Sequence, residues 1–492
     1  MTNQYITVEK LEKYLWDAAV ILRNKMDAGD YKIYIFPLLF YKRLCDVYDQ
    51  EYNKALLESN NDANYAISDI IHTFQIPNDV HWNELRKTTK NIGQKLQQNL
   101  REIEKTNPKR LFRIFGDVDW TNKEILSDES LKNLIEHFST LNLSTDSVPD
   151  DLMGTGYEYL IKQFADDSGH TAAEFYTNRT VVTLMTKIVA PKENESIYDP
   201  TCGSGGMLLE AVNYVKKSGA NYKSLNLYGQ EKNVMTSGIA RMNVLLHGFQ
   251  DAEIKRGDTL SEPLFIEDGK LKRFDVILAN PPYSISKWNH DGWSQDPFGR
   301  NILGIPPKGR ADFAFIQHIL VSLSDVGRAA ILLPHGVLFR DAESKIREKL
   351  IESDKLETII GLGPDLFYNS PMESCVMILR ENKKKKDKVL FINALKQVTR
   401  SGNKNYLSEE NLKTIYTLYE NFKTKEGEAY LANKNEIQDN DCLLSIPLYV
   451  KNFSNKKVGS IQNSILNWKK SSDKLNLSLN EIFKNVEVIK NE

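Results

Sequence analysis

The sequence predicts an α/β fold in which a helical amino-terminal domain precedes a mostly parallel, helix-flanked sheet, and a helical extension follows it. Three observations lead to this prediction. Apolar residues near the amino terminus have helical spacing, short apolar runs alternate with helical stretches in the middle, and the end is polar and rich in Lys, Asn and Glu. We therefore divide the chain into residues 1–150, 151–400 and 401–492.

The amino-terminal domain is predicted from its periodicity. Apolar residues recur at steps of three and four from Val8 to Leu22, which is typical of an amphipathic helix with one buried face. Helical or strongly apolar patterns continue over residues 31–44, 85–104 and 131–143. The polar stretch 144–151 then interrupts them, so we place the first domain boundary there.

The sheet is predicted from short apolar runs that alternate with helical stretches, a spacing typical of parallel strands. Residues 375–379 and 389–392 flank Lys383-Lys384-Lys385-Lys386, and this arrangement predicts a hairpin with a charged tip. We interpret the lysines as a solvated turn rather than a phosphate site. The strands expected before this hairpin cover residues 196–198, 225–228, 275–279, 329–333 and 358–362.

Composition narrows the function classes. The 492 residues are 41% hydrophobic and 26% charged, without an apolar run long enough for a membrane span, and the first residues are too polar for a secretory signal. We predict a cytoplasmic protein, and four widely spaced cysteines predict neither a disulfide framework nor a metal site. The net charge of -2 implies that, if nucleic acid is the substrate, a partner supplies much of the grip on it.

A glycine-rich segment follows the first predicted strand and precedes a helical pattern over residues 207–217. Glycines at such a turn let the backbone approach a ligand closely and leave helix amides facing it. Glu231 follows the next strand, where a carboxylate can bind ribose hydroxyls, and Asp258 can accept a hydrogen bond from the adenine amine of a cofactor. Each carboxylate alone is more often a surface or capping residue, but their order predicts a cofactor site. Its residues are Asp199, Pro200, Thr201, Gly203, Ser204, Gly205, Gly206, Glu231 and Asp258.

The predicted strand at residues 275–279 ends in Asn280-Pro281-Pro282-Tyr283. Two prolines restrict the backbone, which holds the Asn280 side chain and the Pro281 carbonyl in a preset geometry. These two acceptors can bind the N–H groups of a planar amine, favour its pyramidalisation and aim its lone pair at the methyl group of a donor. Tyr283 would stack on an extruded base. The alternative is a rigid turn, but the position after a glycine loop and two carboxylates favours catalysis.

Other chemistries lack their residues. Cytosine C5 methylation needs a cysteine after a proline, and no proline precedes any of the four cysteines. Residues 304–309 resemble a phosphate loop but lack the following Lys-Ser/Thr, so we predict no nucleotide hydrolysis. The histidines show no metal-ligand spacing.

Together these motifs resemble the modification (M) subunit of type I restriction-modification enzymes, an N6-adenine DNA methyltransferase, over nearly the whole chain. Glu174-Phe175-Tyr176-Thr177 looks like that family's cofactor-covering segment, and residues 312–315, 333–339 and 366–369 resemble its later motifs. Asn178 stands where the family usually has proline, a change expected to loosen this turn.

The resemblance implies a Rossmann-like, S-adenosylmethionine-dependent methyltransferase sheet that acts on adenine N6 in double-stranded DNA. It adds Glu174, Phe175, Tyr176 and Thr177 to the cofactor site and makes Asn280, Pro281, Pro282 and Tyr283 catalytic. It also implies a specificity (S) subunit docked to the carboxy-terminal region, a second copy of the M subunit in a complex of two M subunits with one S subunit, and a restriction (R) subunit. The alternatives are a protein-glutamine or RNA amino-methyltransferase and a catalytically idle structural subunit.

Overall fold

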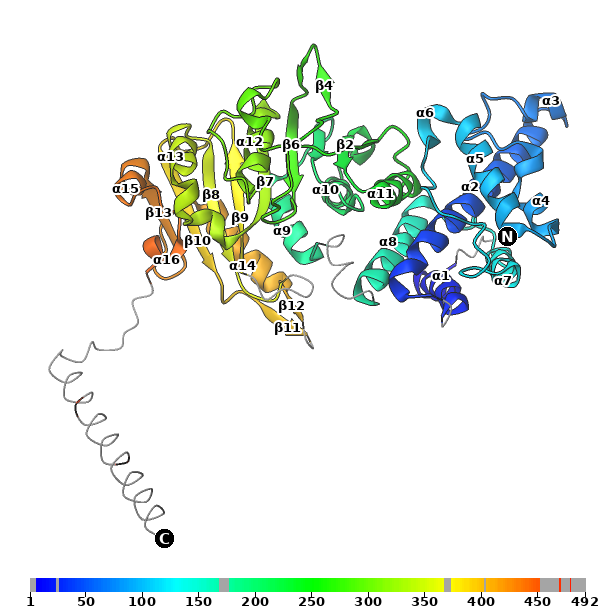
Figure 1. Ribbon diagram of the computed structural model, residues 1–492, viewed down its shortest axis with the longest axis horizontal. Helices are drawn as coiled ribbons and strands as arrows, with labels where there is room; N and C mark the ends of the chain where they lie inside the picture. The colour runs from blue at the N-terminus through cyan, green and yellow to red at the C-terminus, as the bar shows by residue number, and fades with distance from the viewer. Residues whose placement is uncertain are drawn as a thin grey trace, which may run out of the picture. The chain divides into compact units, whose positions relative to one another are not determined.

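The computed structural model describes residues 6–23, 26–167, 177–366, 373–401 and 404–451, with residues 469 and 478 (Figure 1). The chain divides into two units, residues 1–450 and 451–492, and the first unit contains the helical domain and the sheet. In the described part of the chain, no helix is long and apolar enough to cross a membrane.

Helices packed around one apolar core form the amino-terminal domain. The predicted first helix is confirmed as α1 (Val8–Leu22), which buries Leu11, Leu15 and Leu22 and is capped by the Thr7 hydroxyl. The other helices of this domain are α2 (Tyr31–Glu58), α3 (Ala63–Ala66), α4 (Trp82–Lys87), α5 (Ile92–Thr106), α6 (Pro108–Leu111), α7 (Asp128–Phe138) and α8 (Asp150–Asp167).

Residues 85–104, predicted to be helical throughout, are interrupted between α4 and α5. Asn91 has a left-handed backbone with φ 52°, which an α-helix cannot contain. The Asp128 carboxylate accepts hydrogen bonds from the backbone amides of Asn91 and Ile92, at 3.1 and 3.0 Å. A contact from α7 therefore sets where α5 begins, and local periodicity does not reveal it.

The core of the helical domain extends past the boundary predicted at residue 150. α8 buries Tyr157, Leu160 and Phe164 in the same cluster as the apolar face of α1. At Gly156 a Cβ would lie 2.7 Å from Leu15 Cδ1, so the absence of a side chain permits close packing of α8 on α1. The core extends past residue 150 because the apolar face of α8 packs against the amino-terminal helices.

The second part of the first unit is a nine-stranded sheet in the order β13-β10-β8-β9-β7-β6-β1-β2-β3. All of these strands run parallel except β9 and β13, so the predicted mostly parallel sheet is confirmed. Its strands are β1 (Ser196–Asp199), β2 (Asn226–Glu231), β3 (Glu253–Arg256), β6 (Phe274–Ala279), β7 (Leu323–Pro334), β8 (Leu356–Leu362), β9 (Ser374–Arg380), β10 (Lys388–Ala394) and β13 (Ala429–Asn433).

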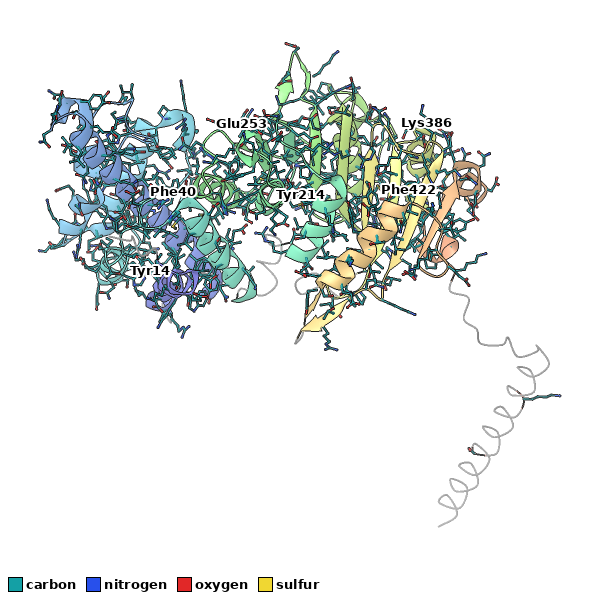
Figure 2. The ribbon with its side chains drawn as sticks, turned by 180° about the vertical axis from the view of Figure 1, so that it is seen from behind. Tyr14, Phe40, Tyr214, Glu253, Lys386 and Phe422 are labelled. Atoms are coloured by element: carbon teal, nitrogen blue, oxygen red, sulfur yellow. The ribbon has the colours of Figure 1, made fainter. Side chains whose placement is uncertain are left out.

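Helices cover both faces of this sheet, which is why central strands such as β8 are buried along their whole length. Figure 2, seen from behind, labels Tyr214 of α10 and Phe422 just after α14 on one of these faces. That face packs against α9 (Arg179–Val189), α10 (Gly206–Lys217), α11 (Val234–Leu246) and α14 (Glu409–Asn421). The other packs against α12 (Asp312–Val321), α13 (Ser344–Glu352), α15 (Lys434–Asp439) and α16 (Ile446–Tyr449).

Two small antiparallel pairs lie outside the main sheet. They are β4 (Ile266–Glu267) with β5 (Lys270–Leu271), and β11 (Thr399–Ser401) with β12 (Lys404–Tyr406).

The predicted hairpin around the lysine run is wrong. β9 and β10 do not pair with each other, because β8 lies between them, antiparallel to β9 and parallel to β10. The lysines are not all solvated either. Lys383 Nζ lies 2.5 Å from Asp354 Oδ1 and its side chain is buried, while Lys385 Nζ donates to the Phe422 carbonyl at 3.1 Å.

The prediction of a helical carboxy-terminal part is only partly confirmed, because this part also contains strands. β13 forms the edge of the main sheet and pairs antiparallel with β10, where Ala429 and Ala432 are buried. Pairing with a distant strand supplies hydrogen bonds that a polar local sequence does not predict. α14, α15 and α16 agree with the helical prediction, whereas most of residues 452–492 lie outside the described part.

Candidate active site

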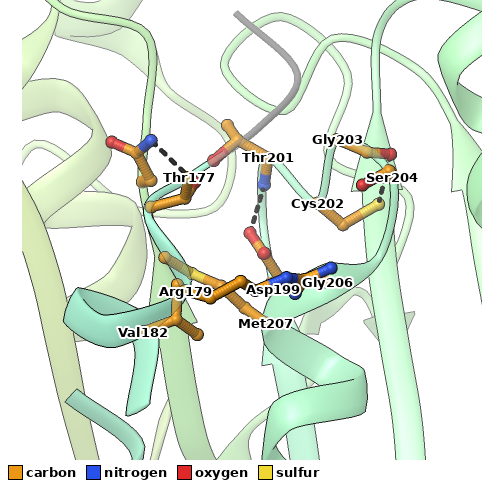
Figure 3. A pocket seen from close by; sticks show the side chains of 11 residues that line it. Thr177, Arg179, Val182, Asp199, Thr201, Cys202, Gly203, Ser204, Gly206 and Met207 are labelled. Atoms are coloured by element: carbon orange, nitrogen blue, oxygen red, sulfur yellow. Dashed lines mark hydrogen bonds between the residues drawn. The ribbon is translucent and has the colours of Figure 1, made fainter. Parts of the chain in front are cut away.

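The glycine-rich segment and the tetrapeptide follow two neighbouring strands. β1 and β6 pair in parallel, with Ile197 opposite Val276, so their carboxyl ends meet at one edge of the sheet. A small pocket that is open to solvent lies at this edge (Figure 3). It is lined by Thr177, Arg179, Val182, Asp199, Thr201, Cys202, Gly203, Ser204, Gly206, Met207 and Asn280.

The glycines have the conformations that their predicted role requires. Gly203 and Gly205 have φ of 53° and 81°, in the left-handed region that disfavours other residues. At Gly206, the first residue of α10, a Cβ would collide with the Arg179 guanidinium. The loop therefore presents backbone at the start of a helix, where amides and the helix dipole favour a ligand carrying a carboxylate or phosphate.

Buried polar side chains fix the loop from behind. Asn243 of α11, fully buried, donates from Nδ2 to the Ser204 carbonyl at 2.9 Å. Thr259 Oγ1 donates to the Pro200 carbonyl at 2.5 Å. These contacts hold the loop in place before any ligand binds, and the sequence-based prediction did not include them.

Glu231 ends β2 beside the loop, as predicted. Its Oε2 accepts from the Gly203 amide at 3.0 Å and its Oε1 from the Asn233 amide at 2.7 Å. Glu231 does not itself line the pocket, and its cofactor role stays a prediction.

Asp258 has the capping contacts that were its alternative interpretation. Its Oδ1 accepts from the amides of Leu260 and Ser261, at 3.0 and 3.4 Å, and its Oδ2 pairs with Lys232 at 2.7 Å. Burial alone would raise the pKa of this carboxyl, but Lys232 and the two amides bring it below its usual value. Asp258 does not line the pocket, and its contact with a cofactor adenine stays a prediction.

Asp199 is a buried carboxyl in the wall of the pocket, only 2% exposed. Burial raises its pKa to about 8, although the amide of Thr201, which donates to Oδ1 at 3.0 Å, acts in the opposite direction. The nearby Glu231 carboxylate raises the pKa further. Figure 3 marks the bond between Asp199 and Thr201. At neutral pH the carboxyl is mostly protonated until a cation compensates it.

Asn280 is held by one end of its amide. Its Nδ2 donates to Thr177 Oγ1 at 3.0 Å, which turns Oδ1 away from the threonine. Oδ1 is buried and has no hydrogen-bond partner among the described residues. A buried acceptor without a partner is costly, so this atom is suited to a ligand N–H.

Tyr283, the last residue of the tetrapeptide, is half-buried, with its hydroxyl group inside the protein. Burial raises the pKa of this hydroxyl well above its usual value, so Tyr283 is a neutral aromatic residue at physiological pH.

The pocket also contains residues that sequence reasoning missed. Arg179, Val182, Cys202 and Met207 line it although none was predicted as a site residue. Arg179 forms an ion pair with Glu158 of α8 at 2.6 Å. Its position two residues after Thr177 was the available signal. Glu174, Phe175 and Tyr176 lie outside the described residues, so their predicted cofactor contacts stay predictions.

The Asn178 side chain makes four hydrogen bonds, and its expected loosening of the cofactor-covering turn stays a prediction, because residues 174–176 of that turn lie outside the described residues. Oδ1 caps α9 by accepting from the amide and hydroxyl of Thr180, at 3.0 and 2.8 Å. Nδ2 donates to the carbonyls of Leu366 and Asn405, at 2.9 and 3.2 Å. Asn178, which directly follows Thr177, is therefore bonded to two segments that are distant in the sequence, at Leu366 and at Asn405.

Replacement of Asn178 by the family's usual proline is expected to lower the free energy of unfolding by about 2 kcal/mol, because the helix cap and two long-range bonds are lost. Urea denaturation of the parent, Asn178→Pro and Asn178→Ala measures this. Asn178→Ala removes the same four bonds without the proline ring and should behave similarly. Undiminished stability of both variants would show that these bonds contribute nothing.

The chain matches two family models. Residues 148–458 match the N-6 DNA methylase family, and residues 11–138 match the HsdM N-terminal domain. The methylase subunit of the type I restriction enzyme MjaVIII of Methanocaldococcus jannaschii is 30% identical over 90% of this chain and 80% of that protein. The corresponding MpnII subunit of Mycoplasma pneumoniae is 28% identical, over 91% and 90%.

A solved structure is similar over the same extent. The methyltransferase subunit of a type I restriction-modification system from Streptococcus thermophilus superposes with a TM-score of 0.78 at 32% identity. The alignment covers 91% of this chain and all of that one. The chain therefore belongs to the N-6 DNA methylase family, as the methylase subunit of a type I restriction-modification enzyme, an adenine-specific DNA methyltransferase.

Proposed function

We propose that Asn280-Pro281-Pro282-Tyr283 carries the transfer of methyl to adenine N6 and that the adjoining pocket binds S-adenosylmethionine. The observation that supports this most directly is the buried, unpartnered Oδ1 of Asn280, which lines the same pocket as the glycine loop. A hydrogen-bond acceptor for the substrate amine thus stands beside the proposed cofactor site.

The residues present fit S-adenosylmethionine. The glycine loop and the first amides of α10 suit its carboxylate, and we propose that Glu231, which holds the Gly203 amide, binds its ribose hydroxyls. Asp199 offers a buried carboxyl to its positive charge. When bound, the cofactor supplies an electrophilic methyl group on a sulfonium.

The proposed mechanism assigns separate tasks to the chain's residues. Asn280 Oδ1 and the Pro281 carbonyl accept hydrogen bonds from the adenine amino group, which localises the nitrogen lone pair. Thr177 keeps the Asn280 amide oriented by accepting from Nδ2. Tyr283 stacks on the extruded base. Since the two acceptors are neutral and weakly basic, the proton lost from the amine passes to solvent.

The pKa of Asp199 provides a test of cofactor binding. With a pKa of about 8, Asp199 carries a proton at pH 7 in the free protein, and a cationic ligand beside it favours the carboxylate. Binding of S-adenosylmethionine at pH 7 is therefore expected to release up to about one proton. Isothermal titration calorimetry in buffers of different ionisation enthalpy measures the release, which Asp199→Asn should abolish.

The same group contributes to the pH dependence of the stability of the free protein. Because its pKa is about 8 when folded and near 3.8 when unfolded, the folded chain binds more protons between these values. Its contribution to stability therefore falls as pH rises through this interval, and Asp199→Asn should flatten that slope. In the calorimetry of cofactor binding, a proton release that is identical in the parent and in Asp199→Asn would exclude Asp199 as the group that loses the proton.

The chain functions as part of a type I complex, and we propose its finer composition from the sequence. A net charge of -2 gives little nonspecific hold on DNA phosphates, so a specificity subunit is proposed to read and grip the duplex. We propose that two copies of this chain join one specificity subunit through residues 401–492, and that a restriction subunit binds the resulting three-subunit complex. Light scattering of the co-purified proteins measures the subunit ratio.

The other functions considered from the sequence have less support. No feature of the described site favours a protein glutamine or an RNA base as substrate. An idle subunit would not need a buried acceptor oriented by Thr177 beside the glycine loop.

A further inference from the structure

A buried ionic cluster lies directly behind the tetrapeptide. Ser284, the residue after Tyr283, has a left-handed backbone with φ 50°. Its amide donates to Asp312 Oδ1 at 2.8 Å, and its hydroxyl donates to Asp312 Oδ2 at 3.3 Å. Asp312 is the first residue of α12 and is 1% exposed. One carboxylate therefore fixes the exit of the tetrapeptide.

Arg340 completes this cluster from a third segment. Its Nη1 donates to Asp312 Oδ2 at 2.7 Å and to Glu343 Oε1 at 3.2 Å, and its Nη2 donates to Ser284 Oγ at 3.4 Å. Glu343 is fully buried and the Arg340 side chain is 15% exposed. The guanidinium thus pairs with two buried carboxylates and also reaches Ser284, the residue that Asp312 holds.

The surrounding backbone is shaped to place this guanidinium. At Gly336 a Cβ would lie 2.5 Å from Arg340 Nε, so the guanidinium packs directly on the Gly336 backbone and a side chain there would displace it. Arg347, fully buried, donates from Nη1 to the Arg340 carbonyl at 2.6 Å. Arg340 is therefore constrained at both its backbone and its side chain.

Burial of such a cluster is a poor means of stabilising a fold. Desolvation of the charged groups offsets most of their attraction, and apolar residues of similar size often stabilise a core equally well. The charges instead fix the relative positions of three residues, because one guanidinium donates directional hydrogen bonds to Asp312, Glu343 and Ser284. Without them, the strained backbone at Ser284 is free to relax, and the tetrapeptide can shift with it.

We propose that Asp312 and Arg340 are positioning residues for methyl transfer: they hold Ser284 and thereby aim Asn280-Pro281-Pro282-Tyr283 at the substrate amine. The inference rests on the proposed role of that tetrapeptide. We expect the cluster to affect the chemical step and not cofactor binding, because Asp312 and Arg340 contact Ser284 next to the tetrapeptide and not the glycine loop.

The test compares Arg340→Gln with Arg380→Gln in the complex with the specificity subunit. Arg380 is a matched control because it also pairs with a 1% exposed carboxylate, Glu357, and its side chain is 17% exposed. Single-turnover transfer of labelled methyl to a cognate duplex gives the rate, calorimetry gives the cofactor Kd, and thermal unfolding gives stability.

Arg340→Gln is expected to lower the transfer rate about 10- to 100-fold with a cofactor Kd within about twofold of the parent. Arg340→Lys should recover part of the rate, because an ammonium still reaches Asp312 but cannot bridge all three partners. Arg380→Gln should lower the unfolding temperature and leave the rate unchanged. If Arg340→Gln does not fold, Asp312→Asn, which keeps an acceptor for the Ser284 amide, is measured against the same expectation.

A transfer rate in Arg340→Gln and Asp312→Asn that falls no further than in Arg380→Gln overturns the positioning role. Asn280→Ala distinguishes this failure from failure of the proposed site. If Asn280→Ala is inactive while the Arg340 and Asp312 variants are fully active, only the positioning inference is wrong. If Asn280→Ala is itself active, the site is wrong and the inference falls with it.

Discussion

Asn280→Ala is expected to lower the rate of adenine methylation about 1000-fold while the cofactor still binds with nearly the parental Kd. The substitution removes the buried Oδ1 that has no partner among the described residues, and with it one of two acceptors that localise the lone pair of the amine. Loss of one preorganised group in a desolvated site typically lowers a rate by about 100- to 1000-fold. The hydrogen bond to Thr177 is lost as well.

Single-turnover transfer of labelled methyl, in complex with the specificity subunit, measures this effect. Thr177→Ser is a suitable control because it keeps a hydroxyl that can accept from Asn280 Nδ2. A cofactor Kd near the parental value shows that the variant is folded and that the loss lies in the chemical step. If Asn280→Ala retained more than about a tenth of the parental rate, the proposed role of Asn280 as an acceptor for the substrate amine would be wrong.

Glu231→Ala is expected to raise the Kd for S-adenosylmethionine about 100-fold, the largest binding effect that we predict. Two contributions combine. The carboxylate holds the amides of Gly203 and Asn233, so its loss frees the glycine loop, and the proposed bonds to ribose hydroxyls disappear. Hydrogen bonds to a charged group contribute about 1.5–3 kcal/mol, and about 2.7 kcal/mol corresponds to 100-fold in Kd.

The effect of Glu231→Ala should be largely one of binding. At saturating cofactor the transfer rate is expected to recover to within about threefold of the parent, in contrast to Asn280→Ala. Glu253→Ala, an exposed carboxylate on the neighbouring strand β3, serves as control and should leave Kd unchanged. A parental Kd in Glu231→Ala would mean that this carboxylate neither supports the loop nor meets the cofactor.

The parts of the fold that were predicted correctly depend on local patterns. α1 has regular helical periodicity from Val8 to Leu22, and β6 ends in an apolar run, residues 276–279, that is bounded by Asn280. The order of glycine loop and tetrapeptide placed both at strand ends, and the parallel pairing of β1 with β6 brings them to one pocket. Such features need no knowledge of distant contacts.

The failures all involve contacts between distant residues. β8 separates β9 from β10 because parallel pairing places it there, whereas the sequence shows only two apolar runs around a lysine-rich turn. β13 is a strand because β10 offers it an edge. Two of the four hydrogen bonds of Asn178 likewise depend on partners, Leu366 and Asn405, that no local pattern identifies.

The sequence by itself determined the chemistry of this protein: an acceptor-bearing tetrapeptide after a buried strand, a glycine loop before a helix, and the family in which the two occur together. These properties belong to short segments whose backbone preferences and functional groups are local. Only the tertiary structure decided that Thr177 orients Asn280, and that Asp312 and Arg340 hold Ser284. Hydrogen bonds and ion pairs act over a few ångströms in space, and the residues they join here are separated by 28 to 103 positions in the chain.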